Sequence, residues 1–521
     1  MSEISNVQNT SFSYLLMAQF ILPFILGSFC FITSNVNILK KNNFHFAKIM
    51  VLIFSLFPLL LNIILLQYYK DFFLKGIFGP LISFPWINQL GVNFLFGLDG
   101  FSYIFLLISS LLYPLIVIFA WDNDHVDKTK SKKSLIQFGL FFILITPFQG
   151  SFMALDMISF YLCWELVLIP LFILMGIWGQ DGRKIANIRF LIYSFFGSLL
   201  MLSAMVLMAV HFKNLNGEIS FNYFLLKSSI LPWNDSFLSL QGIAFFFFLI
   251  SFFIKGHVFP FHGWLVPFYR FGTPLTTLVL GSLLFNMASY SMLRFLPSFF
   301  PNAFSQASSG LLLLGVAGII FGALCTFLQS ETRSIIAYMS VSHMGFFLLG
   351  LGSVSILGLQ AAYVQTINHG ILALGIAGIF FTLATKFKSF DLNDYGGVVT
   401  MAPLMTFFSL IIILGNLGLP GTNGFVGEFL VLLSSSQKWL LVSLLGGSGI
   451  ILGAVYLLNM TRKTFWGNIS DRNRDLVIKL TNLEIIAFAF IAFLIVYMGL
   501  FHMNIFKNSW PSIAKLLAII S

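Results

Sequence analysis

Three ionisable side chains stand inside long apolar stretches of this chain, away from the loops that hold most of its charge. They are Glu165, Lys255 and Glu428. In a bilayer, a charged group at the middle of a helix costs roughly 2.5–3.5 kcal/mol on insertion scales, so such a residue is a candidate for function. The chemistry that suits these groups is proton transfer, which needs two protonation states of similar free energy.

Glu165 and Lys255 could act together as a switch. Burial disfavours a charged lysine and a nearby carboxylate favours it, so a moving partner would change the protonation state. The alternative interpretation is a static ion pair that fixes helix packing.

Three histidines could extend a proton path toward Glu428, because imidazole titrates near neutrality. These are His262, His343 and His369. For each of them the alternative is an ordinary core histidine bonded to a neighbouring carbonyl or hydroxyl group.

Two apolar stretches are interrupted by residues that do not continue a helix. The interruptions lie at residues 254–264, which include Lys255, and at residues 415–428, which end at Glu428. Proline removes a backbone donor and clashes with the preceding turn, and each glycine weakens a helix by about 1 kcal/mol. A single interruption is compatible with a proline kink, but paired broken helices indicate a transport site near the middle of the membrane.

The composition predicts that membrane helices position these residues. Of 521 residues, 58% are hydrophobic and 9% are charged, which excludes an ordinary soluble protein. Apolar runs long enough to cross the hydrocarbon core occur about 14 times. Since backbone groups in lipid must bond within their own segment, the spans are helical. We predict an all-α polytopic membrane protein.

The chain is also predicted to contain two related halves. The interval from Glu165 to Lys255 resembles the interval from His343 to Glu428 in length and in the kind of residue at each end. Five helices per half would invert one half relative to the other. The predicted divisions are N-terminal helices at 1–134, a first repeat at 135–296, a second, inverted repeat at 297–465, and a C-terminal helix and tail at 466–521.

The net charge of +10 does not indicate a nucleic-acid partner, because Lys and Arg are sorted by loop. The positive-inside rule places the odd-numbered loops in the cytoplasm or matrix and both termini on the opposite side. The odd-numbered loops hold Lys40, Lys41, Lys128, Lys130, Lys132, Lys133, Arg183, Lys184, Lys386, Lys388, Arg462, Lys463, Arg472, Arg474 and Lys479. The even-numbered loops hold Lys70, Lys75, Lys213, Lys227 and Lys438.

Other charged residues are expected to be structural. Asp99 precedes a span and is expected to cap it, and Asp156 lies between two spans. Arg294 and Arg333 are expected at helix ends, with their guanidinium groups reaching the membrane surface.

The cysteines do not form a redox or metal site. Cys30, Cys163 and Cys325 are far apart and lack the spacing of metal or iron–sulfur ligands. The sequence also has no phosphate-binding glycine motif and no nucleophile elbow.

Several runs of residues match the pattern of a known family across roughly residues 95–465. They are Trp164-Glu165-Leu166 with Ile169-Pro170, Lys255 with Pro260-Phe261-His262-Gly263-Trp264-Leu265, Ile336-Ala337-Tyr338 with Ser342-His343-Met344-Gly345, His369-Gly370, and Leu419-Pro420-Gly421 with Gly427-Glu428-Phe429. On these residues the chain resembles subunit 4 of NADH dehydrogenase, the M-type antiporter-like subunit of respiratory complex I, an NADH:ubiquinone oxidoreductase.

The resemblance implies 14 helices in two inverted five-helix repeats and proton translocation coupled to quinone reduction elsewhere in the complex. It implies no cofactor or metal in this chain, with FMN, iron–sulfur clusters and quinone in partner subunits. The implied partners are other membrane-arm subunits, including subunit 2-like and subunit 5-like neighbours, and lipids, including cardiolipin. Sixty-five Phe residues suggest an AT-rich organelle genome. The expected location is therefore the mitochondrial inner membrane, with both termini on the intermembrane-space side, and the alternative is a bacterial plasma membrane.

Carried over by residue, the resemblance assigns Glu165 and Lys255 to the family's switch, His343 and His369 to its central relay, and Glu428 to its exit-side acid. His262 belongs to the same matching run as Lys255, and Arg333 stands where the family usually has lysine.

The chain departs from the family pattern at three places. Asn286 occupies the position of a second buried lysine, residues 266–274, which include Arg270, replace the usual run after Trp264-Leu265, and His257 replaces a usual proline. Our hypothesis is that water held by Asn286 bridges Lys255 and His343. The alternatives are a subunit with weakened pumping, an Mrp-type cation/proton antiporter, and the membrane arm of a hydrogenase-like or plastoquinone-reducing relative.

Overall fold

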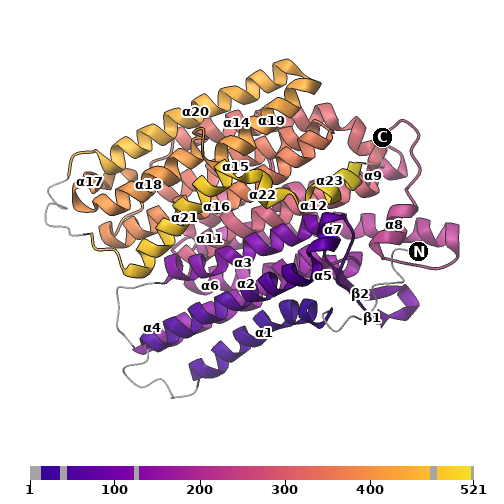
Figure 1. Cartoon of the computed structure of the whole chain (residues 1–521), viewed down its shortest axis with the longest axis horizontal. Helices are drawn as coiled ribbons and strands as arrows, with labels where there is room; N and C mark the ends of the chain where they lie inside the picture. Colours follow the sequence, from indigo (N-terminus) through magenta and orange to yellow (C-terminus); the bar gives the residue numbers. More distant parts are fainter. Residues whose placement is uncertain (1–12, 36–43, 122–127, 470–477, 518–521) are drawn as a thin grey trace.

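The computed structural model describes residues 13–35, 44–121, 128–469 and 478–517. Long helices that run in similar directions make up most of the molecule (Figure 1). The basic residues Lys40, Lys41, Arg472 and Arg474, which the sequence places in odd-numbered loops, lie outside the described residues.

The first half of the described chain contains thirteen α-helices and two strands. They are α1 (Ser13–Asn35), α2 (Phe44–Leu74), β1 (Leu81–Ile87), η1 (Asn88–Leu90), β2 (Val92–Gly97), α3 (Gly100–Ala120), α4 (Lys128–Met153), α5 (Met157–Leu166), α6 (Leu168–Trp178), α7 (Arg183–Asn216), α8 (Tyr223–Ser228), α9 (Leu240–Lys255), α10 (Leu265–Phe271), α11 (Pro274–Val279), the π-helical turn η2 (Leu280–Leu284), α12 (Phe285–Phe299) and α13 (Pro301–Gln306).

The second half of the described chain is helical throughout. Its elements are α14 (Ser308–Phe327), α15 (Thr332–Gly352), α16 (Ile356–Phe387), η3 (Leu392–Asp394), α17 (Val398–Met401), α18 (Pro403–Asn416), α19 (Asn423–Lys438), α20 (Leu440–Phe465), α21 (Asn482–Leu500), α22 (His502–Phe506) and α23 (Trp510–Leu517).

The predicted number of membrane crossings agrees with the structure. Twelve helical segments of the described chain are long and apolar enough to cross a membrane. Two shorter apolar helices, α9 and α18, are each followed after a break by a second helix, α10 and α19. Counting each broken pair as one crossing gives fourteen. One broken helix lies in each predicted repeat, while the inverted relation between the repeats stays a prediction.

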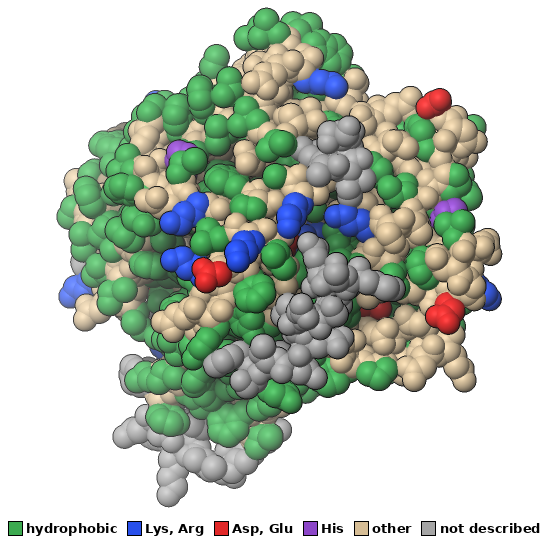
Figure 2. Space-filling view, turned by 45° about the vertical axis from the view of Figure 1, so that its right-hand side comes forward, with side chains coloured by type: hydrophobic (Ala, Val, Ile, Leu, Met, Phe, Trp, Pro, Cys, Tyr) green, Lys and Arg blue, Asp and Glu red, His purple; other side chains and the backbone are tan. Residues whose placement is uncertain are grey.

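The helices divide into central and peripheral ones. The crossing formed by α11, η2 and α12 is buried along its whole length, and α15 is nearly so. Only about a third of the residues in α1, α2 and α20 are buried, and large hydrophobic side chains are exposed along these helices. Figure 2 shows hydrophobic side chains over much of one face, with a small group of Lys and Arg near the middle of the view. Such an apolar exterior fits a lipid environment.

A small β-hairpin departs from the all-α prediction. Strands β1 and β2 pair antiparallel between α2 and α3, and Figure 1 shows the hairpin at the same end of the molecule as α8. Both described ends of the chain lie at this hairpin end. Phe20 of α1 packs against Phe96 of β2 with ring centroids 5.1 Å apart. Lys515 of α23 donates a hydrogen bond to the Gly76 carbonyl oxygen just before β1.

Candidate functional site

Lys255 is the last residue of α9, and Trp164 of α5 holds its ammonium group. Nζ of Lys255 donates a hydrogen bond to the Trp164 carbonyl oxygen and lies 4.0 Å from the centroid of the Trp164 ring. A cation over an indole face is attracted to it, more strongly where water is excluded. Lys255 is 2% exposed. The ring and the carbonyl oxygen therefore take the place of water around this amine.

Glu165 lies next to this contact but is not directly paired with Lys255. It is half-buried, and its Oε1 atom is enclosed without a hydrogen-bond partner. Among the described residues, the ion pairs within 4 Å do not include Glu165 with Lys255. The carboxylate is within electrostatic range of the ammonium group. The structure thus brings Glu165 and Lys255 near each other, but the direct contact of Lys255 is with Trp164.

Asp156 fixes the start of α5, the helix that carries Trp164 and Glu165. Its carboxylate accepts hydrogen bonds from the backbone amides of Ile158 and Ser159 in the first turn, and from the amide of Asn93 after β1. Asp156 lies between two spans, where burial raises its pKa to about 6. This cap connects α5 to the hairpin end of the molecule and so fixes the position of Trp164.

The first broken helix opens directly after Lys255, as predicted. Gly256 ends α9, and His257 has a φ of 47°, a left-handed conformation that L-residues other than Asn, Asp and His seldom adopt. Trp264 closes the break, because its Nε1 donates a 2.8 Å hydrogen bond to the Ile254 carbonyl oxygen. This hydrogen bond spans the break and ties its two sides together.

At the second broken helix, the carboxylate of Glu428 lies against the backbone of Gly418. Gly418 and Gly421 have φ values of 72° and 96°, which favour glycine. A Cβ atom on Gly418 would lie 2.7 Å from Oε2 of Glu428. Glycine at this position lets the carboxylate sit directly against the break between α18 and α19.

The same region brings three predicted site residues together from α15, α16 and α19. Nδ1 of His343 lies 3.8 Å from Oε1 of Glu428 and 3.4 Å from Nε2 of Gln365. The ring centroids of His343 and His369 are 5.1 Å apart. None of the three titratable residues is more than 4% exposed. We call His369, His343 and Glu428 the distal line.

Three ring nitrogens of the distal line are free to exchange a proton. Nε2 of His343 and both ring nitrogens of His369 are buried without a hydrogen-bond partner. A buried imidazole usually satisfies its nitrogens, because an unmade hydrogen bond costs about 1–3 kcal/mol. Open nitrogens on two adjacent imidazoles are what proton transfer between them requires.

Asn286 lies beside the distal line as the second residue of α12, which follows the π-helical turn η2. Such turns carry one extra residue and occur frequently at functional sites. Asn286 is fully buried, and neither its amide oxygen nor its amide nitrogen has a hydrogen-bond partner. A Cβ atom on Gly370 would lie 2.9 Å from Nδ2 of Asn286, so the amide is next to the backbone that follows His369. The expected bridge through Asn286 between Lys255 and His343 stays a prediction.

His257 also belongs to this buried set, although the sequence analysis recorded it only as a replacement for proline. It is fully buried, and its ring interacts with the backbone of Lys255. Its ring centroid is 5.7 Å from that of Phe285, and the Phe285 centroid is 3.9 Å from that of His369. The sequence feature that could have identified His257 is its place in a predicted helix break, two positions after the buried lysine.

His262 lies outside the distal line. It is half-buried, and its ring centroid is 5.0 Å from that of Phe321 and 5.8 Å from that of Phe259. Its Nδ1 atom has no hydrogen-bond partner. His262 therefore packs among aromatic rings, and neither the proton path nor the alternative of a histidine bonded to a carbonyl or hydroxyl group is tested by this geometry.

Arg333 also lies apart from the distal line, at a basic pocket. Its Nε atom is 2.6 Å from Oε1 of Glu331, and its guanidinium group lies 3.9 Å from the centroid of the Phe390 ring. The pocket has a volume of about 610 Å³, and its charged lining residues are Asp181, Arg183, Arg270, Glu331 and Arg333.

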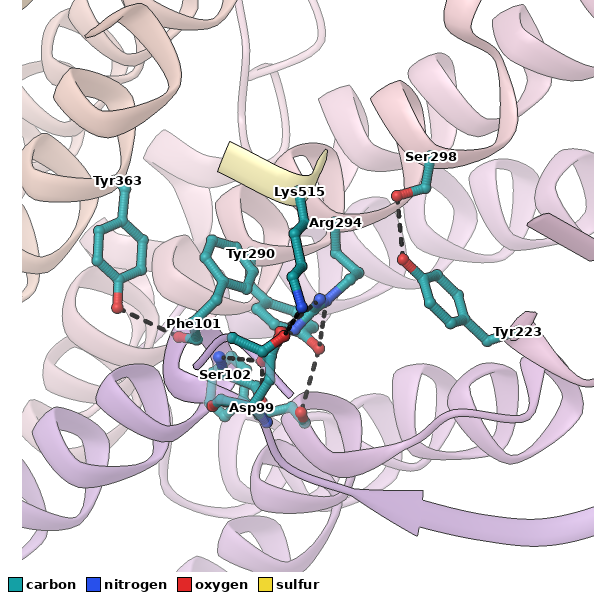
Figure 3. Close-up of polar contacts among 11 residues, drawn as sticks. Asp99, Phe101, Ser102, Tyr223, Tyr290, Arg294, Ser298, Tyr363 and Lys515 are labelled. Carbon is teal, nitrogen blue, oxygen red and sulfur yellow. Dashed lines mark hydrogen bonds and ion pairs between the residues drawn. The ribbon is translucent and has the colours of Figure 1, made fainter. Parts of the chain in front are cut away.

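Arg294 does not reach the membrane surface, so that expectation is wrong. Its NH1 and NH2 atoms bond Oδ2 and Oδ1 of Asp99 at 2.9 and 2.5 Å (Figure 3). Asp99 is also the predicted cap of α3, accepting from the Ser102 amide. Burial acts to raise the pKa of Asp99, but the guanidinium group and Ser102 hold it below its usual value. The partner of Arg294 lies 195 residues earlier, beyond the reach of local sequence patterns.

Within the described ranges, no three or more His, Cys, Asp and Glu side chains gather as a possible metal site. Buried titratable side chains instead lie at both broken helices, Lys255 at the first and the distal line at the second.

The chain matches the profile of a protein family over residues 154–453. The family is described as "NADH:quinone oxidoreductase/Mrp antiporter, TM". Among individual relatives, NADH-quinone oxidoreductase subunit M of Rickettsia bellii is 32% identical over 83% of this chain and 85% of its own length. The subunit M of Buchnera aphidicola from Acyrthosiphon pisum is 29% identical over 96% and 97% of the two chains.

Solved structures share the fold. A chain of respiratory complex I from Thermus thermophilus superposes with a TM-score of 0.80 and 26% identity, over 97% of this chain and all of its own. A chain of the Mrp complex from Dietzia gives the same TM-score of 0.80 at 17% identity, over 98% of this chain and all of its own, a likeness of fold alone.

Proposed function

This chain belongs to the NADH-quinone oxidoreductase subunit M family, and on that premise we propose that it moves protons across the membrane along Lys255, the distal line and the side chains between them. As a family member it is an antiporter-like subunit of the membrane arm of respiratory complex I. We assign NADH oxidation and quinone reduction to partner subunits, which would hold FMN, the iron–sulfur clusters and the quinone.

The contact between His343 and Glu428 carries this proposal. Two titratable groups from different helices lie 3.8 Å apart with almost no exposure, at the broken helix formed by α18 and α19. A carboxylate can accept a proton from an imidazolium at that separation after a small side-chain movement. Burying such groups is costly in a membrane, and proton relays are a recognised use of them.

Lys255 would act as the switch at the other broken helix. With its proton, the amine bonds the Trp164 carbonyl oxygen and rests on the indole face. Movement of Glu165 toward or away from it would change the electrostatic support for the ammonium form. Loss of that support would release the proton toward the distal line. In this scheme the quinone reaction controls the switch from a distance.

The test is the proton-to-electron stoichiometry of the intact complex in membrane vesicles. We expect Lys255→Ala and Glu428→Gln each to lower the stoichiometry, because each interrupts the route at one end. Lys213→Ala, at an exposed lysine in the last turn of α7, is the matched control and should pump normally. Full pumping and full quinone-coupled turnover in Lys255→Ala would show that Lys255 is not the switch.

One observation favours a second candidate, a subunit with weakened pumping. Asn286 sits beside His369 with a side chain that cannot carry a proton charge. Under this alternative, Glu428→Gln and the wild type would show equal stoichiometry, and the subunit would serve mainly to hold its neighbours.

The alternative function, an Mrp-type antiporter, has the same fold as this chain. The fold does not separate the two functions, since both solved structures superpose equally well. The higher identity to the complex I chain and the subunit M relatives support the complex I assignment. Co-purification with flavin-bearing and iron–sulfur-bearing subunits would agree with it, whereas sodium-dependent exchange by the isolated chain would contradict it.

The membrane and the neighbours are part of the same proposal. The chain is a multi-pass membrane protein, and the bacterial origin of the relatives supports a bacterial membrane over the mitochondrial inner membrane. We place both termini on the side opposite the basic loops. Subunit 2-like and subunit 5-like chains would flank it, with anionic lipids such as cardiolipin around the apolar exterior.

A further inference from the structure

We propose that His257 carries protons between Lys255 and the distal line, and that the Phe285 ring is the barrier between the two parts of the route. This inference rests on the proposed function of Lys255 and of the distal line.

The position of His257 in the fold carries the first step of the inference. It follows Lys255 by two residues in the turn that ends α9, and that turn packs against α12, because a Cβ atom on Gly256 would lie 3.2 Å from side-chain atoms of Ala288 and of Met292. Phe285 at the start of α12 then contacts His257, and Phe285 also contacts His369. His257 is within electrostatic range of His369 as well. It therefore lies between the two predicted ends of the route.

The burial and backbone conformation of His257 support the second step of the inference, that this residue has a role beyond packing. The imidazole is fully buried and interacts with the backbone of Lys255, the residue that would release the proton. Its backbone is also in the left-handed region at φ 47°. Non-glycine residues held in this backbone region cluster at functional sites, where the strain is part of the mechanism. A residue kept only for packing would be expected to be apolar here.

One passage moves one proton from Lys255 to His369, so Lys255 ends as a neutral amine and His369 as an imidazolium. One ring nitrogen of neutral His257 takes the proton that the Lys255 ammonium releases, which leaves a neutral amine and an imidazolium. The imidazolium then gives one proton to neutral His369, and His257 returns to the neutral form. Asn286 borders this transfer but takes no proton, because its amide has no accessible charged form.

Phe285 prevents uncontrolled flow along this route. Its ring centroid lies 5.7 Å from that of His257 and 3.9 Å from that of His369, and an aromatic ring neither donates nor accepts a proton. Transfer thus requires the ring to turn, or a water molecule to pass beside it. The extra residue of η2, directly before Phe285, gives the backbone of this segment a different helical pitch from that of α12.

The experiment uses the intact complex in membrane vesicles, with proton-to-electron stoichiometry measured per assembled complex. We expect His257→Gln to lose as much stoichiometry as Lys255→Ala, while His257→Lys, which keeps a titratable group, recovers most of it. His211→Gln, a histidine of α7 outside the route, is the matched control. In the His257→Gln background, Asn286→Lys should also restore pumping, because it adds an amine beside His369.

The outcomes separate this inference from the proposed function. Wild-type stoichiometry in His257→Gln together with loss in Lys255→Ala would overturn the role of His257 and leave the proposed function intact. Wild-type stoichiometry in both would overturn the proposed function itself. Equal loss in the Gln and Lys variants, without rescue by Asn286→Lys, would show that His257 acts only in packing.

A second measurement tests the barrier without changing a histidine. Phe285→Ala should make an imposed pH gradient collapse faster in vesicles without NADH, while Phe425→Ala, a ring of α19 outside the route, should not. An unchanged leak in Phe285→Ala would overturn the role of Phe285. This measurement remains decisive if the His257 variants do not assemble.

Discussion

At the scale of single residues, the position of Glu428 depends on a glycine in the second helix break. Glu428 reaches the second helix break because Gly418 has no side chain, and a Cβ atom there would come within 2.7 Å of Oε2. The titratable groups therefore lie in spaces that glycine leaves open.

This arrangement predicts that Gly418→Ala lowers pumping more than it lowers assembly. The added methyl group would push the Glu428 carboxylate away from the break and change its 3.8 Å contact with His343. A left-handed backbone position also disfavours alanine by roughly 1–2 kcal/mol. The measurement is proton-to-electron stoichiometry beside the amount of assembled complex.

Gly421→Ala separates the two effects. Gly421 is also left-handed, at φ 96°, but a Cβ atom there would meet nothing within 4 Å. It should share the backbone strain and keep normal stoichiometry. Equal pumping defects in the two variants would argue against crowding of Glu428.

At the scale of elements, α3 and α12 are joined by one buried ion pair. Asp99 caps the first turn of α3, and Arg294 extends from α12 to meet it with both terminal nitrogens (Figure 3). The guanidinium carbon lies 4.7 Å from the centroid of the Phe101 ring in the same turn of α3. Since α12 also carries Asn286, this pair fixes the helix that borders the proposed route.

We expect Asp99→Asn to destabilise the subunit by about 3–5 kcal/mol, because it leaves the Arg294 charge buried without its partner. The amount of assembled complex in the membrane and its thermal inactivation would measure the loss. Arg294→Met should also destabilise the subunit, because it leaves the Asp99 carboxylate buried without its partner.

The double variant Asp99→Asn with Arg294→Met should be less destabilised than either single variant, because neither charge is then left alone in an apolar site. Additive losses would show that the two residues act independently. The surface pair of Arg183 and Asp181, 3.9 Å apart, provides the control, since removing an exposed pair costs about 0–1 kcal/mol.

The sequence predicted the elements better than their contacts. Apolar length, proline and clustered glycine depend on nearby residues, so the crossings and both breaks could be read directly. The same reasoning misplaced Arg294 at the membrane surface, because its partner is distant in sequence. It also missed the hairpin of β1 and β2, whose short strands carry little of the alternation that marks a half-buried sheet.

At the scale of the whole molecule, different elements lie at the two ends of the bundle, and we expect the two ends to face opposite sides of the membrane. The β-hairpin, the start of α1 and the end of α23 gather at one end. The loop that joins α6 to α7 lies at the opposite end, because α7 crosses the membrane before α8. The positive-inside rule assigns that second end to the side where the basic loops stay.

This topology predicts opposite labelling of two exposed loop positions. Asp181→Cys, before α7, should react with a membrane-impermeant thiol reagent only from the basic-loop side, and Asp235→Cys, before α9, only from the other side. Both residues are exposed. Cys30 and Cys163 are buried and should stay unreactive, and Cys325 would be replaced by Ser in both variants. Labelling of both positions from one side would contradict the crossing by α7.

The sequence alone determined the chemical class of this protein, because the cost of burying charge in lipid makes Glu165, Lys255 and Glu428 conspicuous wherever they fall. It also determined that His343 and His369 belong with Glu428, through the resemblance of their runs to one family. Only the tertiary structure decided which groups touch. It put Trp164 rather than Glu165 against Lys255, paired Arg294 with Asp99, and placed His257 and Phe285 before His369. The reason is physical: insertion cost and helix breaking depend on local composition, whereas a contact depends on how helices distant in sequence pack.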